Sequence, residues 1–196
     1  MKRAFDLAVS LLALVVTSPV VAVAAVAVKV DSPGPAFYNG RRTGRGGREF
    51  RIHKLRSMGS GANATGPAIT AGDDPRITRV GRFLRRSKID ELPQLLNVVK
   101  GEMSLVGPRP EDPTYVERYT REQRRLLTVR PGITGAASLA FLDEEEGLSG
   151  GSAEDRYVAD VLPKKLALEL AYLDRATFAS DLGILFQTAG AVLRRR

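Results

Sequence analysis

The first long apolar segment of the chain runs from Leu7 to Val28 and contains only three polar residues, Ser10, Thr17 and Ser18. Lys2 and Arg3 precede the segment, and Lys29 follows it. At a rise of about 1.5 Å per residue, a helix of about 22 residues just spans a hydrocarbon core of about 30 Å. The pattern therefore predicts a helix that enters a membrane.

Three interpretations of this segment compete: a cleaved signal peptide, a single crossing, or a helix that enters the membrane and returns on the same side. The apolar region of a signal peptide has about 7–15 residues, which is shorter than this segment. Ala22-Val23-Ala24 imitates a cleavage site, so length alone does not exclude a signal peptide.

The flanking charges and a central proline favour the re-entrant helix. Positive residues prefer the cytoplasm, and both flanks of the segment are positive, which a straight crossing does not satisfy. Ser18-Pro19 stands near the middle, where proline removes a helix hydrogen bond and favours a kink. We expect residues 1–30 to form a re-entrant, Pro-kinked membrane helix and residues 31–196 to form a domain on the cytoplasmic face. The downstream positive flank consists of Arg41, Arg42, Arg45, Arg48 and Arg51.

A second pattern, between residues 87 and 101, predicts a helix that begins with two carboxylates. Ser87-x-x-Asp90 has the spacing of a capping box, and Lys100-Gly101 is a typical helix end. Asp90 and Glu91 then lie at the helix N-terminus, where free N–H groups favour an ionised carboxylate and an attached phosphoryl group. Pro93 is tolerated in a first turn. The predicted apolar face is Leu92, Leu95, Leu96 and Val99.

The remaining segments predict one β-hairpin and several amphipathic helices. Residues 36–38 and 48–53 alternate around an Arg- and Gly-rich turn, which is typical of a hairpin with a basic tip. Helices are expected at Thr114–Val129, Asp155–Leu173 and Phe178–Leu193. The fold class is therefore α/β, mostly α with a small β-hairpin: a single compact domain with the membrane helix at its N-terminus and amphipathic helices at the membrane interface.

Composition narrows the classes of partner. The chain has 196 residues, a formal net charge of +8, no Cys and one His, so a zinc site, a disulfide scaffold and Cys–His catalysis are excluded in practice. The charge favours nucleic acid, anionic lipid or a phosphorylated substrate. Nucleic acid is disfavoured, because the basic stretch lacks aromatic residues and the apolar segment would be unexplained. A basic face on the expected helix at 114–129 suits either an anionic lipid bilayer or plain solvent; it consists of Arg118, Arg121, Arg124 and Arg125.

Several long strings resemble one family, the bacterial sugar transferases that load polyprenyl phosphate, known as monotopic phosphoglycosyl transferases. The resemblance covers most of residues 1–135. Its strings are Gly34-Pro35-Ala36-Phe37-Tyr38, Lys54-Leu55-Arg56-Ser57-Met58, Asp74-Pro75-Arg76-Ile77-Thr78, the run from Ser87 to Pro110, and Val129-Arg130-Pro131-Gly132-Ile133-Thr134-Gly135.

The resemblance implies a reaction in two displacements. Asp90 would attack the β-phosphate of a nucleoside diphosphate sugar, expected to be a UDP-sugar, and polyprenyl phosphate would then take the sugar phosphate from Asp90. Glu91 would accept the proton of the lipid phosphate or position it. Arg85, Arg109 and Asp181 match family positions at the phosphate site.

The resemblance also implies Mg²⁺ held with Asp90, the Ser18-Pro19 break in the membrane helix, and a location on the cytoplasmic face of the bacterial inner membrane. A membrane-bound scaffold without catalysis is the alternative, against which the intact Asp90-Glu91 pair and Arg109 argue. The sugar, the glycan pathway and the oligomeric state, a homodimer included, stay open.

Overall fold

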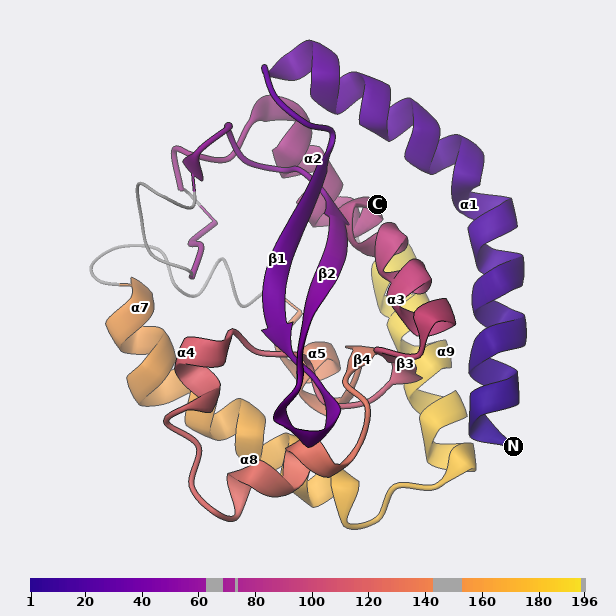
Figure 1. Ribbon diagram of the computed structural model, residues 1–196, viewed down its shortest axis with the longest axis vertical. Helices are drawn as coiled ribbons and strands as arrows, with labels where there is room; N and C mark the ends of the chain where they lie inside the picture. Colours follow the sequence, from indigo (N-terminus) through magenta and orange to yellow (C-terminus); the bar gives the residue numbers. More distant parts are fainter. Residues whose placement is uncertain (63–68, 73, 143–152, 195–196) are drawn as a thin grey trace.

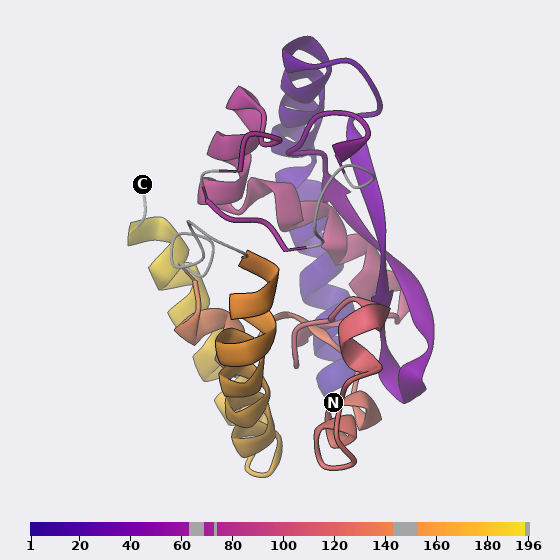
Figure 2. The same ribbon diagram turned by 90° about the vertical axis from the view of Figure 1, so that its left-hand side faces the viewer.

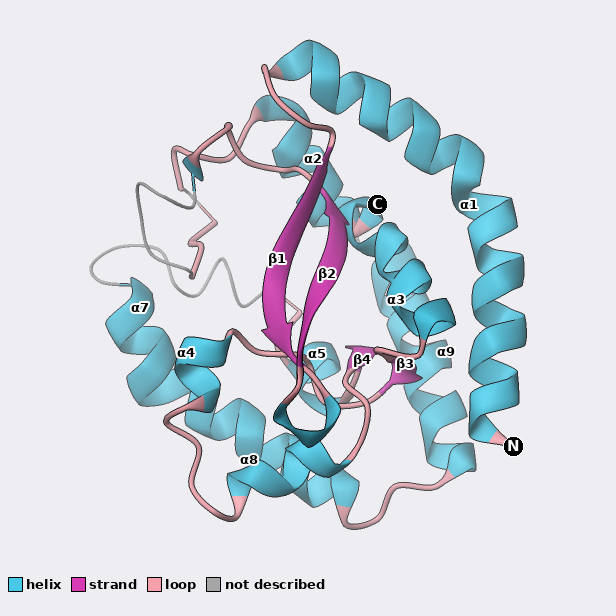
Figure 3. Cartoon of the chain, viewed as in Figure 1, coloured by secondary structure: helices cyan, strands magenta, loops and turns pink. Residues whose placement is uncertain are grey.

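The computed structural model describes residues 1–62, 69–72, 74–142 and 153–194 (Figure 1). Helices surround a central antiparallel hairpin, and a second, very short sheet lies below it (Figure 3). In the view of Figure 2, helices α8 and α9 lie on one side of the molecule and the hairpin lies on the other. The predicted class, mostly α with a small sheet, is confirmed.

Helix α1, Lys2–Asp31, is the one helix among the described residues that is long and apolar enough to cross a membrane. It runs along one edge of the molecule and changes direction part-way (Figure 1). Pro19 has no N–H for the carbonyl of Val15, and the Ser18 hydroxyl donates to that carbonyl instead, at 2.9 Å. The Ser-Pro pair thus leaves no helix carbonyl without a donor at this point.

One side of α1 packs on the domain and the other is bare. Asp6 and Ser10 in its first half and Ala24 and Val28 in its second half are buried. The exposed side is apolar, which suits contact with lipid; its large residues are Leu11, Leu12, Val15, Val16, Val20, Val23, Val26 and Val30.

The predicted hairpin is confirmed, with longer strands than expected. Strand β1, Phe37–Thr43, pairs antiparallel with β2, Glu49–Leu55, and a short helical turn, η1 at Arg45–Gly47, joins them. The buried positions of β2 are Ile52 and Leu55, which pack against helical residues. By strand alternation, Lys54 lies on the same face as Ile52 and on the opposite face from Leu55.

The predicted capping box at Ser87 is wrong. Helix α2, Arg79–Ser87, has already begun at the N-cap Thr78, whose hydroxyl accepts from the Gly81 N–H at 3.0 Å. Ser87 is its last residue and donates to the Phe83 carbonyl at 2.8 Å, a contact that serine commonly makes inside a helix. Lys88, with φ 57°, then ends α2.

A 3₁₀ segment, η3 at Ile89–Gln94, follows Lys88 and leads into helix α3, Leu95–Lys100. Because η3 has fewer residues per turn than an α-helix, the predicted apolar face is shifted: Val98 is fully buried, whereas Leu96 is 43% exposed. The expected helix end is confirmed, since Gly101 follows α3 with φ 86°.

The short sheet is parallel and joins β3, Ser104–Val106, to β4, Gly132–Thr134. Residues 107–111, here called the Arg109 loop, leave the end of β3. A Cβ on Gly107 would lie 2.5 Å from the Arg130 carbonyl, so only glycine allows the loop to approach β4 this closely.

The expected helix at Thr114–Val129 is wrong, because two short pieces take its place: α4, Pro113–Val116, and a 3₁₀ helix, η4, Gln123–Thr128. Between them Thr120 and Gln123 exchange hydrogen bonds with each other's backbone N–H groups, at 2.8 and 3.2 Å. This Thr-x-x-Gln capping box starts a new helix. The expected apolar contacts do reach the core, with Val116, Tyr119 and Leu126 buried.

The two C-terminal helices are confirmed. After the short helix α5, Ala136–Ala140, the chain forms one helical run from α7, Ala153–Arg156, through a π-helical turn, η5, Tyr157–Val161, into α8, Leu162–Leu173. Pro163 supplies no N–H to the preceding turn, which accounts for the wider turn there. Helix α9, Phe178–Arg194, ends the described chain.

Candidate active site

The two predicted catalytic carboxylates lie in η3, behind the left-handed residue Lys88. Asp90 is 5% exposed, and its Oδ1 is buried with no hydrogen-bond partner among the described residues. Glu91 is next to it, with a side chain 12% exposed. The turn at Lys88 therefore carries two adjacent carboxylates into the body of the domain.

Two cations hold Glu91. Lys54 Nζ, from the end of β2, and Arg109 Nη2, from the Arg109 loop, both lie 3.0 Å from Glu91 Oε1. Although burial opposes ionisation, the charges of Arg109 and Lys54 hold the pKa of Glu91 well below its usual value. Glu91 is thus an ionised group with its donors in place.

Asp90 has the opposite electrostatics. Burial, together with the negative charge of Glu91, raises the pKa of Asp90 to about 6, although Lys54 and Arg85 lower it. The predicted position of both carboxylates in a first helical turn is confirmed: η3 begins after its N-cap Lys88, whose carbonyl accepts the Glu91 N–H at 3.2 Å. For the pKa of Asp90, burial outweighs this position.

Arg85 and Arg109 approach the pair from two sides. Arg85 lies in the last turn of α2, lowers the pKa of Asp90 and has its Nη1 3.4 Å from Ser57 Oγ. Arg109 stands between Pro108 and Pro110 on the loop after β3. The structure therefore brings Asp90, Glu91, Arg85 and Arg109 together, as the sequence predicted.

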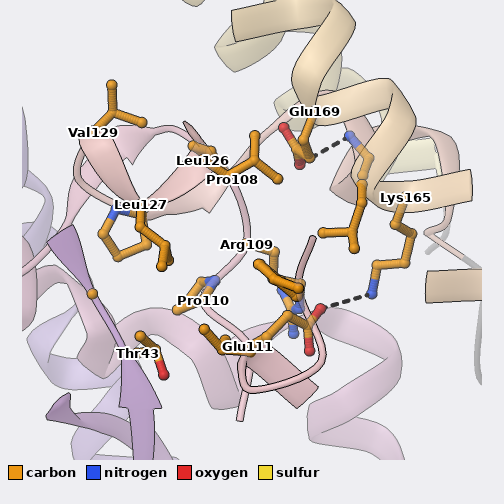
Figure 4. Close-up of a pocket in the computed structure, with 16 residues that line it drawn as sticks. Thr43, Pro108, Arg109, Pro110, Glu111, Leu126, Leu127, Val129, Lys165 and Glu169 are labelled. Carbon is orange, nitrogen blue, oxygen red and sulfur yellow. Dashed lines mark hydrogen bonds and ion pairs between the residues drawn. The ribbon is translucent and has the colours of Figure 1, made fainter. Parts of the chain in front are cut away.

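A closed cavity of about 30 Å³ lies behind the Arg109 loop (Figure 4). Its polar walls come from Glu111 on the loop and from Lys165 and Glu169 on α8. This volume is that of a single water molecule.

Asp181 lies elsewhere. It is on α9, where its carboxylate pairs with Lys2 and accepts from the Tyr172 hydroxyl at 2.7 Å. Lys2 also donates to the Val106 carbonyl at 3.0 Å. The structure thus joins Asp181 to the start of α1 rather than to Asp90 and Glu91.

Ser18 and Pro19 are in the middle of α1. Pro19 lines an apolar groove of about 780 Å³ between the second half of α1 and α2. The groove reaches Ile89, the residue directly before Asp90. The groove thus extends from the bend in α1 to the start of η3, the segment that carries the carboxylate pair.

Lys54 was not among the predicted site residues. The sequence shows Lys54 only as a lysine near the end of an otherwise alternating strand. It does not indicate which carboxylate that lysine contacts. Its neighbour Arg56 is structural: it is 7% exposed and donates to the carbonyls of Ser32, Pro33 and Pro35 after the end of α1.

The acidic groups allow a magnesium ion only in combination with a substrate. Among the described residues no cluster of three or more His, Cys, Asp or Glu side chains could hold a metal. Asp90 offers one buried oxygen without a partner, and Mg²⁺ is commonly bound by one or two carboxylates together with substrate phosphates. The residues present fit that mode of binding.

Comparisons with known proteins agree on one family. The family model described as bacterial sugar transferase matches residues 1–195. The chain is 37% identical over 195 residues to the UDP-N-acetylgalactosamine-undecaprenyl-phosphate N-acetylgalactosaminephosphotransferase of Aeromonas hydrophila, covering 98% of this chain and 43% of that protein.

Two further relatives are closer to this chain in length. The UDP-glucose:undecaprenyl-phosphate glucose-1-phosphate transferase of Caulobacter vibrioides is 37% identical over 98% of this chain and 69% of its own length. The exopolysaccharide production protein PSS of Rhizobium leguminosarum bv. phaseoli is 37% identical over the whole of this chain and 96% of its own length. The chain thus spans under half of the Aeromonas relative and nearly all of the Rhizobium one.

Proposed function

Because this chain belongs to the bacterial sugar transferase family, we propose that it moves a sugar phosphate from a UDP-sugar to undecaprenyl phosphate through a covalent intermediate on Asp90. The observation that carries the proposal is the buried, unbonded Oδ1 of Asp90 beside the ionised, doubly paired Glu91. A carboxylate with a free oxygen among fixed cations is arranged for nucleophilic attack on a phosphate.

In the first displacement an Asp90 oxygen bonds to the β-phosphorus of the donor, and the bond from that phosphorus to the oxygen of UMP breaks. UMP leaves with the bonding electron pair. The sugar phosphate then stands on Asp90 as an acyl phosphate. Arg85 and Arg109 offer planar guanidinium groups to the equatorial oxygens, where charge develops.

In the second displacement an oxygen of undecaprenyl phosphate attacks the same phosphorus, and the bond to Asp90 breaks. The products are undecaprenyl diphosphate sugar and the free carboxylate of Asp90. Glu91, kept ionised by Lys54 and Arg109, holds these cations where they can position the incoming lipid phosphate.

We include Mg²⁺ in the proposal as a partner of Asp90 and of the donor's diphosphate. When bound, it neutralises phosphate charge at a site that has carboxylate ligands and no thiols. The chain's own contribution is the buried, unpartnered Asp90 oxygen and the cations that surround it.

The packing of α1 supports the proposed re-entrant topology at the cytoplasmic face of the inner membrane. Asp6 in its first half accepts from the Ser104 hydroxyl at 2.7 Å, and Val28 in its second half packs with Leu55 and Leu84. A helix that crossed a hydrocarbon core of about 30 Å would place these two halves beyond reach of one cytoplasmic domain. The groove beside Pro19 extends along α1 and α2 as far as Ile89, the residue before Asp90.

The topology has a direct test in intact cells, with single cysteines at positions 2 and 45. Both should resist a thiol reagent that stays in the periplasm and react after permeabilisation. Periplasmic labelling at position 2 with protection at position 45 would refute the re-entrant helix.

The chemistry is tested with Asp90→Asn, assayed for UMP release from UDP-N-acetylgalactosamine, UDP-glucose and UDP-galactose with undecaprenyl phosphate. Asparagine keeps the size of the side chain and removes its nucleophilic oxygen, so UMP release and any trapped phosphosugar adduct should disappear. Asp155→Asn, at an acidic residue in α7, is the matched control and should retain wild-type activity. Full activity of Asp90→Asn would reject the assignment of the nucleophile.

A further inference from the structure

The Arg109 loop has few hydrogen-bond donors of its own. Pro108 and Pro110 carry no backbone N–H, so Arg109 has the single N–H of residues 108–110. The loop is fixed at both ends: the Gly107 N–H donates to the Thr134 carbonyl at 3.0 Å, and the Glu111 carbonyl accepts from the Thr43 N–H at 3.0 Å. Its central N–H needs an acceptor from another element, because a buried donor is rarely left unpaired.

Glu169, on α8, provides that acceptor. Its side chain is 3% exposed, and its Oε1 accepts from the Ala137 N–H, in the first turn of α5, at 3.2 Å. The Arg109 backbone N–H faces this carboxylate and helps to lower its pKa, and Glu169 Oε2 is buried with no hydrogen-bond partner among the described residues. Figure 4 shows Glu169 pointing from α8 toward the loop. One carboxylate thus joins α8 to α5 and faces the middle of the Arg109 loop across the cavity that both line.

A second contact from the same face of α8 holds the next part of the loop. Lys165 is one turn before Glu169, and its Nζ lies 3.5 Å from Glu111 Oε1 and 3.1 Å from the Tyr157 hydroxyl. Tyr157 in turn donates to Glu111 at 2.8 Å. α8 therefore holds the loop at two successive points, behind the side chain of Arg109.

We propose that Glu169 is a positioning residue for Arg109: it holds the backbone from which the guanidinium reaches Glu91. This inference rests on the proposed function. Arg109 Nη2 is 3.0 Å from Glu91 Oε1, and the flanking prolines make the loop stiff, so a shift of the Arg109 backbone moves the guanidinium with it. A misplacement of about 1 Å at such a group can lower a rate about 100-fold.

The chemical nature of residue 169 supports a role beyond packing. A buried carboxylate is unfavourable unless it is used, and burial raises the pKa of Glu169 to about 7 although the N–H groups of Ala137 and Arg109 lower it. An apolar residue would fill the same space with a smaller desolvation penalty, but it would not offer the Arg109 N–H the acceptor oxygen that Glu169 offers.

The test is a double-mutant cycle between Glu169→Ala and Arg109→Ala, assayed as UMP release from whichever of UDP-N-acetylgalactosamine, UDP-glucose and UDP-galactose the wild type uses fastest. Alone, Glu169→Ala should lower kcat/KM by about 10- to 100-fold, as loss of an outer-shell partner does. In the Arg109→Ala background it should change kcat/KM by less than about 2-fold, because there is no longer a guanidinium to position.

Two further variants separate positioning from folding. Leu162→Ala, also buried on α8 but outside the lining of the loop cavity, should lower kcat/KM by the same factor in the wild-type and Arg109→Ala backgrounds. Glu169→Gln keeps an acceptor oxygen for the N–H groups and should restore kcat/KM to within about 5-fold of the wild type, inside the range of outer-shell effects. An equal loss from Glu169→Ala in both backgrounds, or no rescue by Glu169→Gln, would overturn the proposal.

Hydrogen exchange gives a readout that does not depend on activity. Glu169→Ala should speed exchange in a peptide covering residues 107–111, and Leu162→Ala should not. A wild-type protein that releases no UMP from any of the three donors would refute the proposed function, whereas unchanged exchange at 107–111 in Glu169→Ala would refute the anchoring itself.

Discussion

The replacement of Lys54 by methionine tests the electrostatic arrangement of the site. Lys54 has a side chain 18% exposed and contacts Glu91 Oε1 at 3.0 Å. Methionine has a similar length and no charge. The substitution therefore removes one of two cations from a buried carboxylate while it keeps the apolar packing of the lysine stem.

The magnitude follows from the second cation. Removing one partner of a buried ion pair costs about 3–5 kcal/mol, since the other charge is left uncompensated. Here Arg109 remains at 3.0 Å from the same oxygen. Burial also lowers the pKa of Lys54, which shows that its charge is itself held at a cost that methionine would relieve. We therefore expect a loss of about 2 kcal/mol, a decrease in Tm of about 4–8 °C for a chain of this size.

The measurement is urea unfolding of the detergent-solubilised protein, followed by circular dichroism. Lys100→Met is the matched control: Lys100 is exposed, its Nζ lies 2.8 Å from His53 Nε2, and the substitution should change stability by less than about 0.5 kcal/mol. In the double variant Lys54→Met/Glu91→Gln both charges are gone, so the two losses should not add, with a coupling of about 1–2 kcal/mol.

The reasoning would be refuted by a Lys54→Met protein as stable as Lys100→Met. It would also be refuted by losses that add in the double variant, since additivity means that Lys54 and Glu91 do not interact in the folded state.

Three other predictions concern a close backbone approach, the pKa of Glu169 and the magnesium ion. Gly81→Ala should destabilise the folded protein by about 3 kcal/mol in urea unfolding, because a Cβ there would lie 2.0 Å from the Ser57 carbonyl oxygen. Gly190→Ala is the control: its Cβ would point into open space on α9, and it should stabilise the folded protein by about 0.5–1 kcal/mol. The pKa of Glu169 is raised from 4.5 to about 7 in the folded state, so its contribution to stability is greatest below pH 4.5 and is lost as the pH rises through 7. Relative to Glu169→Gln, the wild type should lose up to about 3 kcal/mol of unfolding free energy over this range. Parallel pH profiles of stability for the two proteins would contradict this. EDTA should stop UMP release and added Mg²⁺ should restore it, whereas activity that survives exhaustive chelation would exclude the proposed magnesium.

Local patterns predicted the elements whose stability is local. The hairpin and the helix end at Gly101 came from turn chemistry and alternation, and both are confirmed. The capping box at Ser87 failed because the sequence holds a better N-cap upstream, Thr78, and a helix that has started there runs on to Ser87. Thr120-x-x-Gln123 was the opposite case, a true capping box inside a segment interpreted as one helix.

The candidate site could be predicted only as far as it is contiguous in sequence or carried by a family string. Asp90 and Glu91 are neighbours, and Arg85 is five residues away. Lys54 comes from a strand 37 residues before Glu91, and nothing in the local pattern pairs them. Asp181 was expected near the phosphate site, but its partner Lys2 is 179 residues away, a contact that depends on how α1 packs on α9.

The way in which α1 is attached has a practical consequence for anyone who wishes to make this enzyme water-soluble. Deleting residues 1–30 would strip Leu55, Leu84 and Leu95 of their cover and would leave Ser104 without the Asp6 carboxylate. Arg56, which now binds the carbonyl of Val28 and those just beyond the helix, would lose part of its shell as well. The apolar helix packs into two of the hydrophobic clusters of the described core, so it is not an interchangeable tether, and a graft of another protein's anchor in its place should yield insoluble material.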